Sequence, residues 1–263
     1  MDSHPYDSPF TGAAAYYDRF RAPYAPEALE YAFAAFGDGE DARALDLGCG
    51  PGTLAIPLSR RFAEVVAVDA DGGMIAEAKR LAKARGRRNI RWLRRRAEDV
   101  SSDLGAFRLA TLGQSFHWMD RDRVLSRLAK AIEDGGGLAF INPGRRRPQE
   151  SWEDIAGEIV SRYLGARGRH PGMNVEPKHE PALLRSTHFC RFTTCEFASV
   201  VERDIPSIVG CLYSTSGAAK PLFGDSAPAF EADLKAALLR LRPSGRFEER
   251  LETEVLLAPR VSG

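Results

Sequence analysis

The sequence predicts an α/β fold: a Rossmann-like, seven-stranded, mostly parallel sheet with an antiparallel edge hairpin and helices on both faces. Three observations lead to this prediction. Short apolar runs alternate with stretches of helical length from residue 43 to residue 142. A glycine turn, Gly48-Cys-Gly-Pro-Gly52, follows the first apolar run, and the next run ends at Asp69. Two alternating stretches, 192–202 and 251–258, come later and suit a hairpin at the edge of the sheet.

The elements follow from hydrophobic period and from helix and turn signals. The predicted strands of the core are 43–47, 65–69, 90–94, 109–113 and 137–142, and its helices are 53–62, 72–85 and 121–133. Further helices are expected at 13–20, 26–36, 150–166, 205–214 and 229–241, with a turn at 37–41, a loop over 143–148 and an irregular segment over 167–182. We expect one domain, 1–263, with a core of 40–142, 192–202 and 251–258 and a helical lid of 1–36, 143–190 and 205–245.

Composition excludes several classes of protein. The chain has 263 residues, 44% of them hydrophobic and 28% charged, and a formal net charge of +1, which fits a globular protein and not a general polyanion binder. Its four cysteines form no C-x-x-C pair, so reduced thiols and a cytoplasmic location are expected. Neither a signal peptide nor an apolar run of membrane-spanning length is present, so we expect no membrane partner.

The glycine turn has the chemistry of a nucleotide-cofactor site. Glycines at 48, 50 and 52 let the backbone turn sharply and approach a ligand closely. Asp69 ends the second strand, where a carboxylate can accept both hydroxyls of a ribose. Dinucleotide-binding turns usually read G-x-G-x-x-G, whereas this turn reads G-x-G-x-G and is preceded by Asp46.

With an acid before G-x-G-x-G, the chain resembles class I methyltransferases that use S-adenosylmethionine (SAM), in particular the bacterial small-molecule type that modifies natural products. Tyr16–Tyr24 is similar to the N-terminal cofactor-capping segment of that family, and Ala97-Glu-Asp99 to its adenine-side motif. Gly113–Trp118 and Ile208–Ser214 are similar to the fourth-strand loop and a lid helix of one branch. Relatives often have Asp where this chain has Arg96, so no adenine contact is expected from that side chain.

The resemblance implies SAM as cofactor, S-adenosylhomocysteine as its product, and no metal. The residues that would bind the cofactor are Tyr17, Arg21, Asp46, Gly48, Gly50, Gly52, Asp69, Ala70, Met74, Ala97, Glu98 and Gln114. Those that would bind the acceptor are His117, Trp118 and Tyr213. His117 is also the candidate general base, because a neutral imidazole beside the transferred methyl can take a proton from an amine or hydroxyl. His170, His179 and His188 are expected to be surface or packing residues.

The predicted reaction moves a methyl group from SAM to an amine or hydroxyl of a small polar acceptor, as expected for a secondary metabolite. The acids Glu176, Glu180, Asp204 and Asp225 would suit a cationic amino sugar such as an aminoglycoside. We expect a monomer or homodimer without a nucleic-acid partner.

Three alternatives stay open. An RNA methyltransferase would use the arginines at 85, 87, 88, 91, 94, 95 and 96, although a solvated helix end and strand face also explain them. A dehydrogenase would bind NAD(H) in place of SAM. A protein without activity would bind SAM and transfer nothing.

Overall fold

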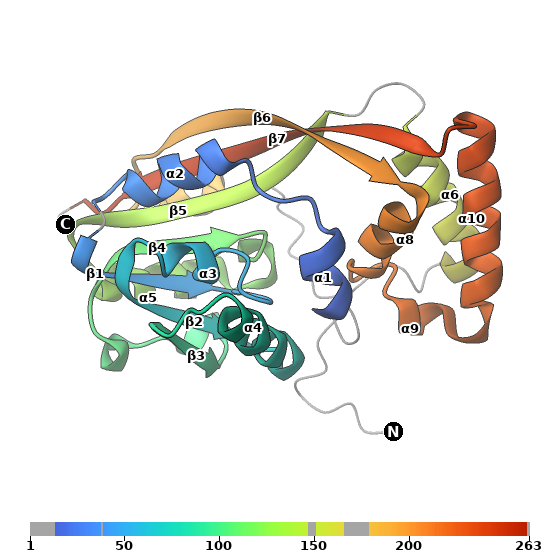
Figure 1. The fold of residues 1–263 in the computed structure, drawn as a ribbon. Coiled ribbons are helices and arrows are strands. Elements are labelled where there is room, and N and C mark those ends of the chain that lie inside the picture. Colours follow the sequence, from blue (N-terminus) through green and yellow to red (C-terminus); the bar gives the residue numbers. More distant parts are fainter. Residues whose placement is uncertain (1–13, 38, 147–150, 166–178, 262–263) are drawn as a thin grey trace. The chain divides into compact units, whose positions relative to one another are not determined.

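The computed structural model describes residues 14–37, 39–146, 151–165 and 179–261 (Figure 1). From Ala14 to Arg94 the elements are α1 (Ala14–Phe20), α2 (Pro26–Ala34), β1 (Gly39–Leu47), α3 (Ala55–Leu58), β2 (Phe62–Asp69), α4 (Gly72–Ala84) and β3 (Ile90–Arg94). The 3-10 turns η1 (Ala97–Asp99) and η2 (Ser102–Leu104), β4 (Phe107–Gly113), the 3-10 turn η3 (Phe116–Trp118), α5 (Arg121–Ala131) and β5 (Ile132–Arg146) follow. The remaining elements are α6 (Trp152–Leu164), α7 (Glu180–Arg185), β6 (Thr193–Asp204), α8 (Ile205–Tyr213), α9 (Lys220–Phe223), the 3-10 turn η5 (Gly224–Ser226), α10 (Ala227–Leu241) and β7 (Arg246–Pro259).

The strands form one seven-stranded sheet in the order β3-β2-β1-β4-β5-β7-β6. β1 pairs in parallel with β2 and β4, β2 with β3, and β4 with β5. The edge pair β7–β6 is antiparallel. After β1 the chain adds β2 and β3 on one side of this strand, and it then crosses to β4 on the other side. The direction of the strand order therefore reverses between β1 and β4. In open α/β sheets, ligands bind at the carboxyl ends of the strands at such a switch point. The predicted fold class is therefore confirmed.

The chain divides into two compact units. Unit 1 consists of Met1–Pro23, Gly144–Pro171 and Ala198–Glu252, and unit 2 of Tyr24–Pro143, Gly172–Phe197 and Thr253–Gly263. The long strands β5, β6 and β7 contribute residues to both units. Among the described residues, no helix is both long and apolar enough to cross a membrane.

In unit 2, helices cover both faces of the sheet. Side chains alternate along the strands, so Ala44 of β1 faces one cluster and Leu45 faces the other. The first cluster contains buried residues of α2 and α3, and the second contains those of α5 and α7. The residues Val65–Val68 are fully buried, so both faces of this strand are covered, as expected for a central parallel strand.

Unit 1 packs α1, α6, α8, α9 and α10 around aromatic rings. Tyr213, Phe223 and Phe230 are almost fully buried, and the rings of Phe223 and Phe230 stack with centroids 4.1 Å apart. Tyr16 of α1 meets Tyr213 edge-on at 5.4 Å, which attaches the N-terminal helix to this cluster.

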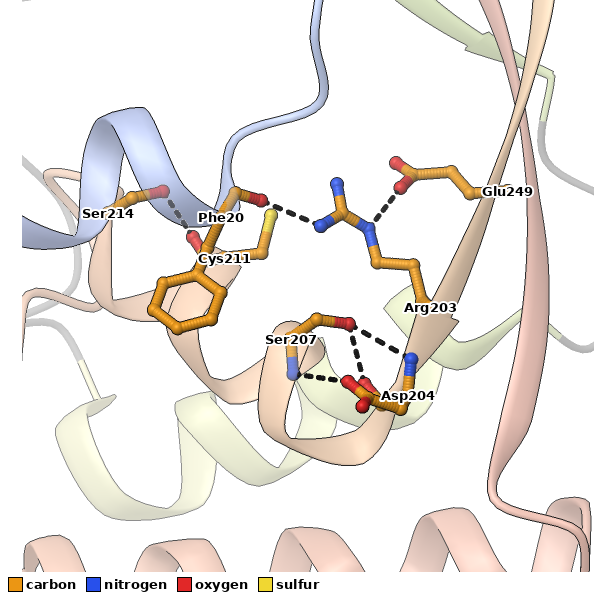
Figure 2. A network of polar contacts seen from close by, with 7 residues as sticks. All are labelled: Phe20, Arg203, Asp204, Ser207, Cys211, Ser214 and Glu249. Atoms are coloured by element: carbon orange, nitrogen blue, oxygen red, sulfur yellow. Dashed lines mark hydrogen bonds and ion pairs between the residues drawn. The ribbon is translucent and has the colours of Figure 1, made fainter.

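A buried ion pair also attaches α1 within unit 1. Figure 2 shows the Arg203 guanidinium between the Glu249 carboxylate and the main chain of Phe20. Arg203 Nε donates to Glu249 Oε2 at 2.6 Å, and Nη1 donates to the Phe20 carbonyl at 2.6 Å. The two side chains are only 4% and 1% exposed. The strands β6 and β7 thus hold the carboxyl end of α1.

Several predicted boundaries were wrong. The helix expected at 53–62 is a single turn, α3, because the chain is still turning at 51–54 and the apolar Phe62 already begins β2. The loop expected at 143–148 is strand as far as Arg146, because β5 continues where β7 lies beside it. The turn expected at 37–41 ends early, since β1 begins at Gly39 and pairs there with Phe62. The short helices α7 and α9 were not predicted.

Candidate functional site

The glycine turn after β1 has the backbone that only glycine adopts easily. Gly48, Gly50 and Gly52 have φ of 66°, 52° and 88°. A Cβ on Gly48 would lie 2.4 Å from Cβ of Ser115, whereas a Cβ on Gly50 would have no atom of the described residues within 4 Å. The first glycine is therefore required by packing. The second lies against open space, which is the arrangement expected where a backbone approaches a ligand.

Asp69, at the end of β2, is fixed by main-chain amides. Its Oδ2 accepts from Gly50 N and its Oδ1 from Asp71 N, both at 2.8 Å. Burial raises the pKa of Asp69, and these amides act in the opposite direction. Two carboxylate oxygens offer about four acceptor positions. The main chain thus fixes the position of the carboxylate, and its binding of the ribose hydroxyls stays a prediction.

Asp46 lies under the same turn and is 1% exposed. In the sheet it pairs with Ala67 of β2 and Thr111 of β4. Thr111 Oγ1 donates to Asp46 Oδ1 at 2.9 Å, while Oδ2 is buried without a partner among the described residues. Burial raises the pKa of Asp46 to about 7, against the effect of the Thr111 hydroxyl. An incompletely bonded buried carboxyl is costly without a ligand or a proton.

The predicted adenine side is formed by the start of α4 and by η1. Asp71 caps α4 by accepting from Gly73 N and Met74 N at 2.6 and 3.2 Å. Ala70 is exposed, whereas Met74 is 3% exposed. Ala97 and Glu98 are both buried in η1.

The Glu98 carboxylate has partners within the protein. Its Oε1 accepts from Asp120 N at 2.9 Å, and Arg96 Nε lies 3.3 Å from its Oε2. Burial would raise the pKa of Glu98, but the hydrogen bond from Asp120 and the Arg96 charge outweigh it and lower the pKa. Arg96, the departure from the family pattern, thus pairs with the neighbouring acid. Contacts of Ala70, Met74, Ala97 and Glu98 with adenine stay predictions.

The end of β4 carries the predicted catalytic residue. Gln114 has φ of 50° and is the one non-glycine residue with positive φ in the described chain, a strained conformation that is concentrated at functional sites. The Ser115 hydroxyl donates to the Leu47 carbonyl at 2.7 Å and so ties this loop to β1. His117 and Trp118 follow in η3 and are partly exposed, with ring centroids 5.3 Å apart. Burial, and then the nearby Arg121, lower the pKa of His117. The imidazole is therefore neutral at pH 7.

A second histidine lies beside this loop. His179 is 6% exposed, and its ring lies 5.5 and 5.1 Å from those of Phe116 and Phe140. Its Nε2 is 2.8 Å from Nδ2 of Asn142, near the carboxyl end of β5. Burial lowers the pKa of His179 to about 4. His179 is the packing residue the sequence suggested. Asn142 was missed, although its place at the end of a predicted strand is the same signal that indicated Gln114.

Other predicted residues belong to unit 1. Arg21 lies 5.0 Å from the Tyr17 ring and donates from Nη2 to the Ser214 carbonyl at 3.4 Å, so these neighbours on α1 do lie together. Tyr213 is 1% exposed and donates its hydroxyl to Glu231 at 2.9 Å. The roles of Tyr17, Arg21 and Tyr213 stay predictions, as do those of the unit 2 residues. His170 and Glu176 lie outside the described residues.

Two further expectations concern metals and acidic residues. No group of three or more His, Cys, Asp or Glu side chains in the described parts of the chain has the arrangement of a metal site. Of the acids expected to attract a cationic acceptor, Asp204 caps α8 by accepting from Ser207 N at 2.9 Å, and Asp225 is exposed in η5. Glu180 is the first residue of α7 in unit 2.

Comparison with known proteins finds methyltransferases that are similar to the part of the chain around this site. Residues 44–136 match the family model of a methyltransferase domain. An uncharacterized methyltransferase of Mycobacterium tuberculosis is 31% identical over 153 residues, which are 58% of this chain and 59% of that protein. A 23S rRNA uracil-C5 methyltransferase of Stenotrophomonas maltophilia is 42% identical over 65 residues, only 14% of its length. Residues 44–136 are thus similar to a methyltransferase domain, and the chain spans less than two thirds of the length of these relatives.

Solved structures agree on the fold. A protein from Anaeromyxobacter dehalogenans, provisionally assigned as a type II methyltransferase, has a TM-score of 0.60 at 22% identity, over 92% of this chain and 98% of that one. A SAM-dependent methyltransferase from Thiobacillus denitrificans, solved with S-adenosylhomocysteine, has a TM-score of 0.54 at 18% identity, over 99% of this chain and 100% of that one. At these identities the likeness concerns the fold.

Proposed function

We propose that this chain is a SAM-dependent methyltransferase that methylates an amine or hydroxyl of a small polar acceptor. One observation carries the proposal: the turn of the matched domain leaves open space at Gly50, and the amide of Gly50 also holds the Asp69 carboxylate. A bare backbone beside a carboxylate that main-chain amides hold in place is suited to a nucleoside. The orphaned Oδ2 of Asp46 is suited to a cationic group of the same ligand.

The residues present therefore fit the cofactor. Asp69 would accept the ribose hydroxyls, the turn at Gly48–Gly52 would lie along the ligand, and Asp46 would face the ammonium group of its methionine part. Bound SAM supplies a methyl group on a positively charged sulfur, which is already a good leaving group. The protein has to orient the acceptor and exclude water, and orientation alone can lower a barrier by on the order of 7–11 kcal/mol.

The proposal is tested first by binding. S-adenosylhomocysteine should raise the melting temperature of the purified protein and bind measurably by calorimetry. A labelled-methyl screen of amines and hydroxylated metabolites then identifies the acceptor, with amino sugars included because of the acids described above. Activity on bulk RNA in the same screen would identify the alternative, and preferential binding of NAD(H) would contradict the proposal.

Replacing Asp69 by Ala should weaken S-adenosylhomocysteine binding at least about 100-fold. Each hydrogen bond from a ribose hydroxyl to a carboxylate contributes roughly 1.5–3 kcal/mol, and the substitution removes both. Asp103→Ala is the control, because Asp103 is an exposed acid whose partners are Arg95 at 3.5 Å and the Ser101 hydroxyl. Equal affinity in the Asp69 and Asp103 variants would exclude the ribose assignment.

Replacing His117 by Ala should lower kcat by about 100- to 10,000-fold, the usual contribution of a general base, without changing S-adenosylhomocysteine affinity. The pKa of His117 is lowered, so the base becomes protonated only below its ordinary range near 6.5. Wild-type kcat should therefore stay constant through pH 7 and fall at a pH below 6.5. His188→Ala is the control, because His188 contacts its own neighbour Thr187. Full turnover without His117 at saturating acceptor would exclude the role.

A further inference from the structure

The carboxyl group of Asp46 has fewer partners than a buried carboxylate needs. It lies in the central strand β1, between β2 and β4, and is 1% exposed. One oxygen accepts a hydrogen bond from the Thr111 hydroxyl at 2.9 Å, and the other has no hydrogen-bond partner within 3.5 Å among the described residues. An ionised carboxylate normally fills several acceptor positions, so this geometry disfavours the charged form.

The nearby acid Asp69, at the end of β2, also disfavours the charge of Asp46, because it is a like charge. The Cys49 thiol of the turn is buried beside both acids, and burial raises its pKa, so it supplies no charge. The groups with the opposite effect are neutral: the Thr111 hydroxyl of β4 and the Ala55 amide of α3. In the described chain no Lys, Arg or His forms an ion pair with Asp46. Among the described residues, Asp46 therefore has no countercharge although it is buried.

We propose that Asp46 gives up a proton when the ammonium group of the cofactor binds, so that the ligand itself supplies the missing countercharge. The O–H bond of the carboxyl group breaks, the proton passes to water or buffer, and the carboxylate stays behind as the partner of the ammonium. This inference depends on the proposed function, because it assumes that the cofactor binds over this turn.

The expected proton count follows from linkage. Because burial raises the pKa of Asp46 to about 7, close to one proton should be released per ligand at pH 6 and about half a proton at pH 7. Ligand affinity should rise about tenfold per pH unit on the acid side of this pKa and then level off. An acid that was already ionised would give neither effect.

Calorimetry with S-adenosylhomocysteine at pH 6 and pH 7, in buffers of different ionisation enthalpy, measures the count directly. The control ligand is 5′-methylthioadenosine, which keeps the nucleoside and lacks the amino-acid end. Binding of 5′-methylthioadenosine should release fewer protons than binding of S-adenosylhomocysteine, and the difference should equal the contribution of Asp46. Any proton linked to Asp69, whose pKa is also raised by burial, should appear with both ligands because both carry the ribose.

Two variants separate Asp46 from other groups. Asp46→Asn should abolish the difference in proton release between the two ligands. Thr111→Val removes the hydrogen bond that stabilises the carboxylate, so the count at pH 7 should rise from about half toward one. The inference is overturned if the two ligands release equal numbers of protons on binding to the wild type, or if the difference in proton release is unchanged in Asp46→Asn. Either result leaves the proposed function intact. Failure of S-adenosylhomocysteine to bind at either pH contradicts the proposed function itself.

Discussion

Replacing Gly50 by Ala should abolish S-adenosylhomocysteine binding, lowering affinity by at least about 100-fold, while unit 2 stays folded. A Cβ at this position would meet no atom within 4 Å in the part of the chain that the structure describes, so that part can accommodate it. The remaining cost is that of an L-residue with φ of 52°, about 1–2 kcal/mol. The methyl group would instead occupy the space that we assign to the cofactor, where a glycine allows close approach of the backbone.

Gly86→Ala is the matched control for this variant. Gly86 lies in the turn after α4 and has φ of 68°, and an added Cβ there would likewise have no atom within 4 Å among the residues with described positions. Both variants should therefore lose a similar free energy of unfolding in urea, and only Gly50→Ala should lose ligand binding by calorimetry. Affinities within threefold of each other would show that the open space at Gly50 is not the ligand site.

The sequence predicted the fold well where local chemistry determines it. The run Val65–Val68 can be stable only in a central strand buried on both faces, and strands β3 and β4 begin and end within two residues of their predicted positions. The turn residues Gly48, Gly50 and Gly52 all have positive φ, which agrees with the sharp turn that the sequence predicted. In these segments the local preference and the final environment agree.

Tertiary pairing explains most of what the sequence did not indicate. Gly144 is in strand β5 because the neighbouring β7 lies against it, and an added Cβ there would be 3.0 Å from the Glu252 carbonyl. The Thr111 hydroxyl matters only because β4 pairs beside Asp46, and nothing near Thr111 in the sequence shows that register. The pKa of Asp46 likewise depends on burial by distant segments. The division into two units was also not visible from composition.

Replacing Arg203 by Met should destabilise unit 1 by about 3–5 kcal/mol, the cost of leaving one member of a buried ion pair without its partner. Arg203 is the member that reaches both Glu249 and the Phe20 carbonyl (Figure 2). Urea unfolding should show the loss, and hydrogen exchange should show faster exchange of the α1 amides. Arg250→Met is the control. Arg250 and Glu248 both lie in β7 and pair at 2.9 Å, but the side chain of Arg250 is 71% exposed. The expected loss of stability is therefore about 0–1 kcal/mol.

The double variant Arg203→Met with Glu249→Met separates charge burial from the loss of packing. Two apolar side chains of similar length leave no unpaired buried charge, so most of the stability should return. The exchange of the α1 amides should remain faster than in the wild type, because the Phe20 carbonyl still lacks its donor. If the double variant were as unstable as the sum of the two single variants, the ion pair would not be the source of the effect, and the packing of the Arg203 side chain against its neighbours would have to explain it.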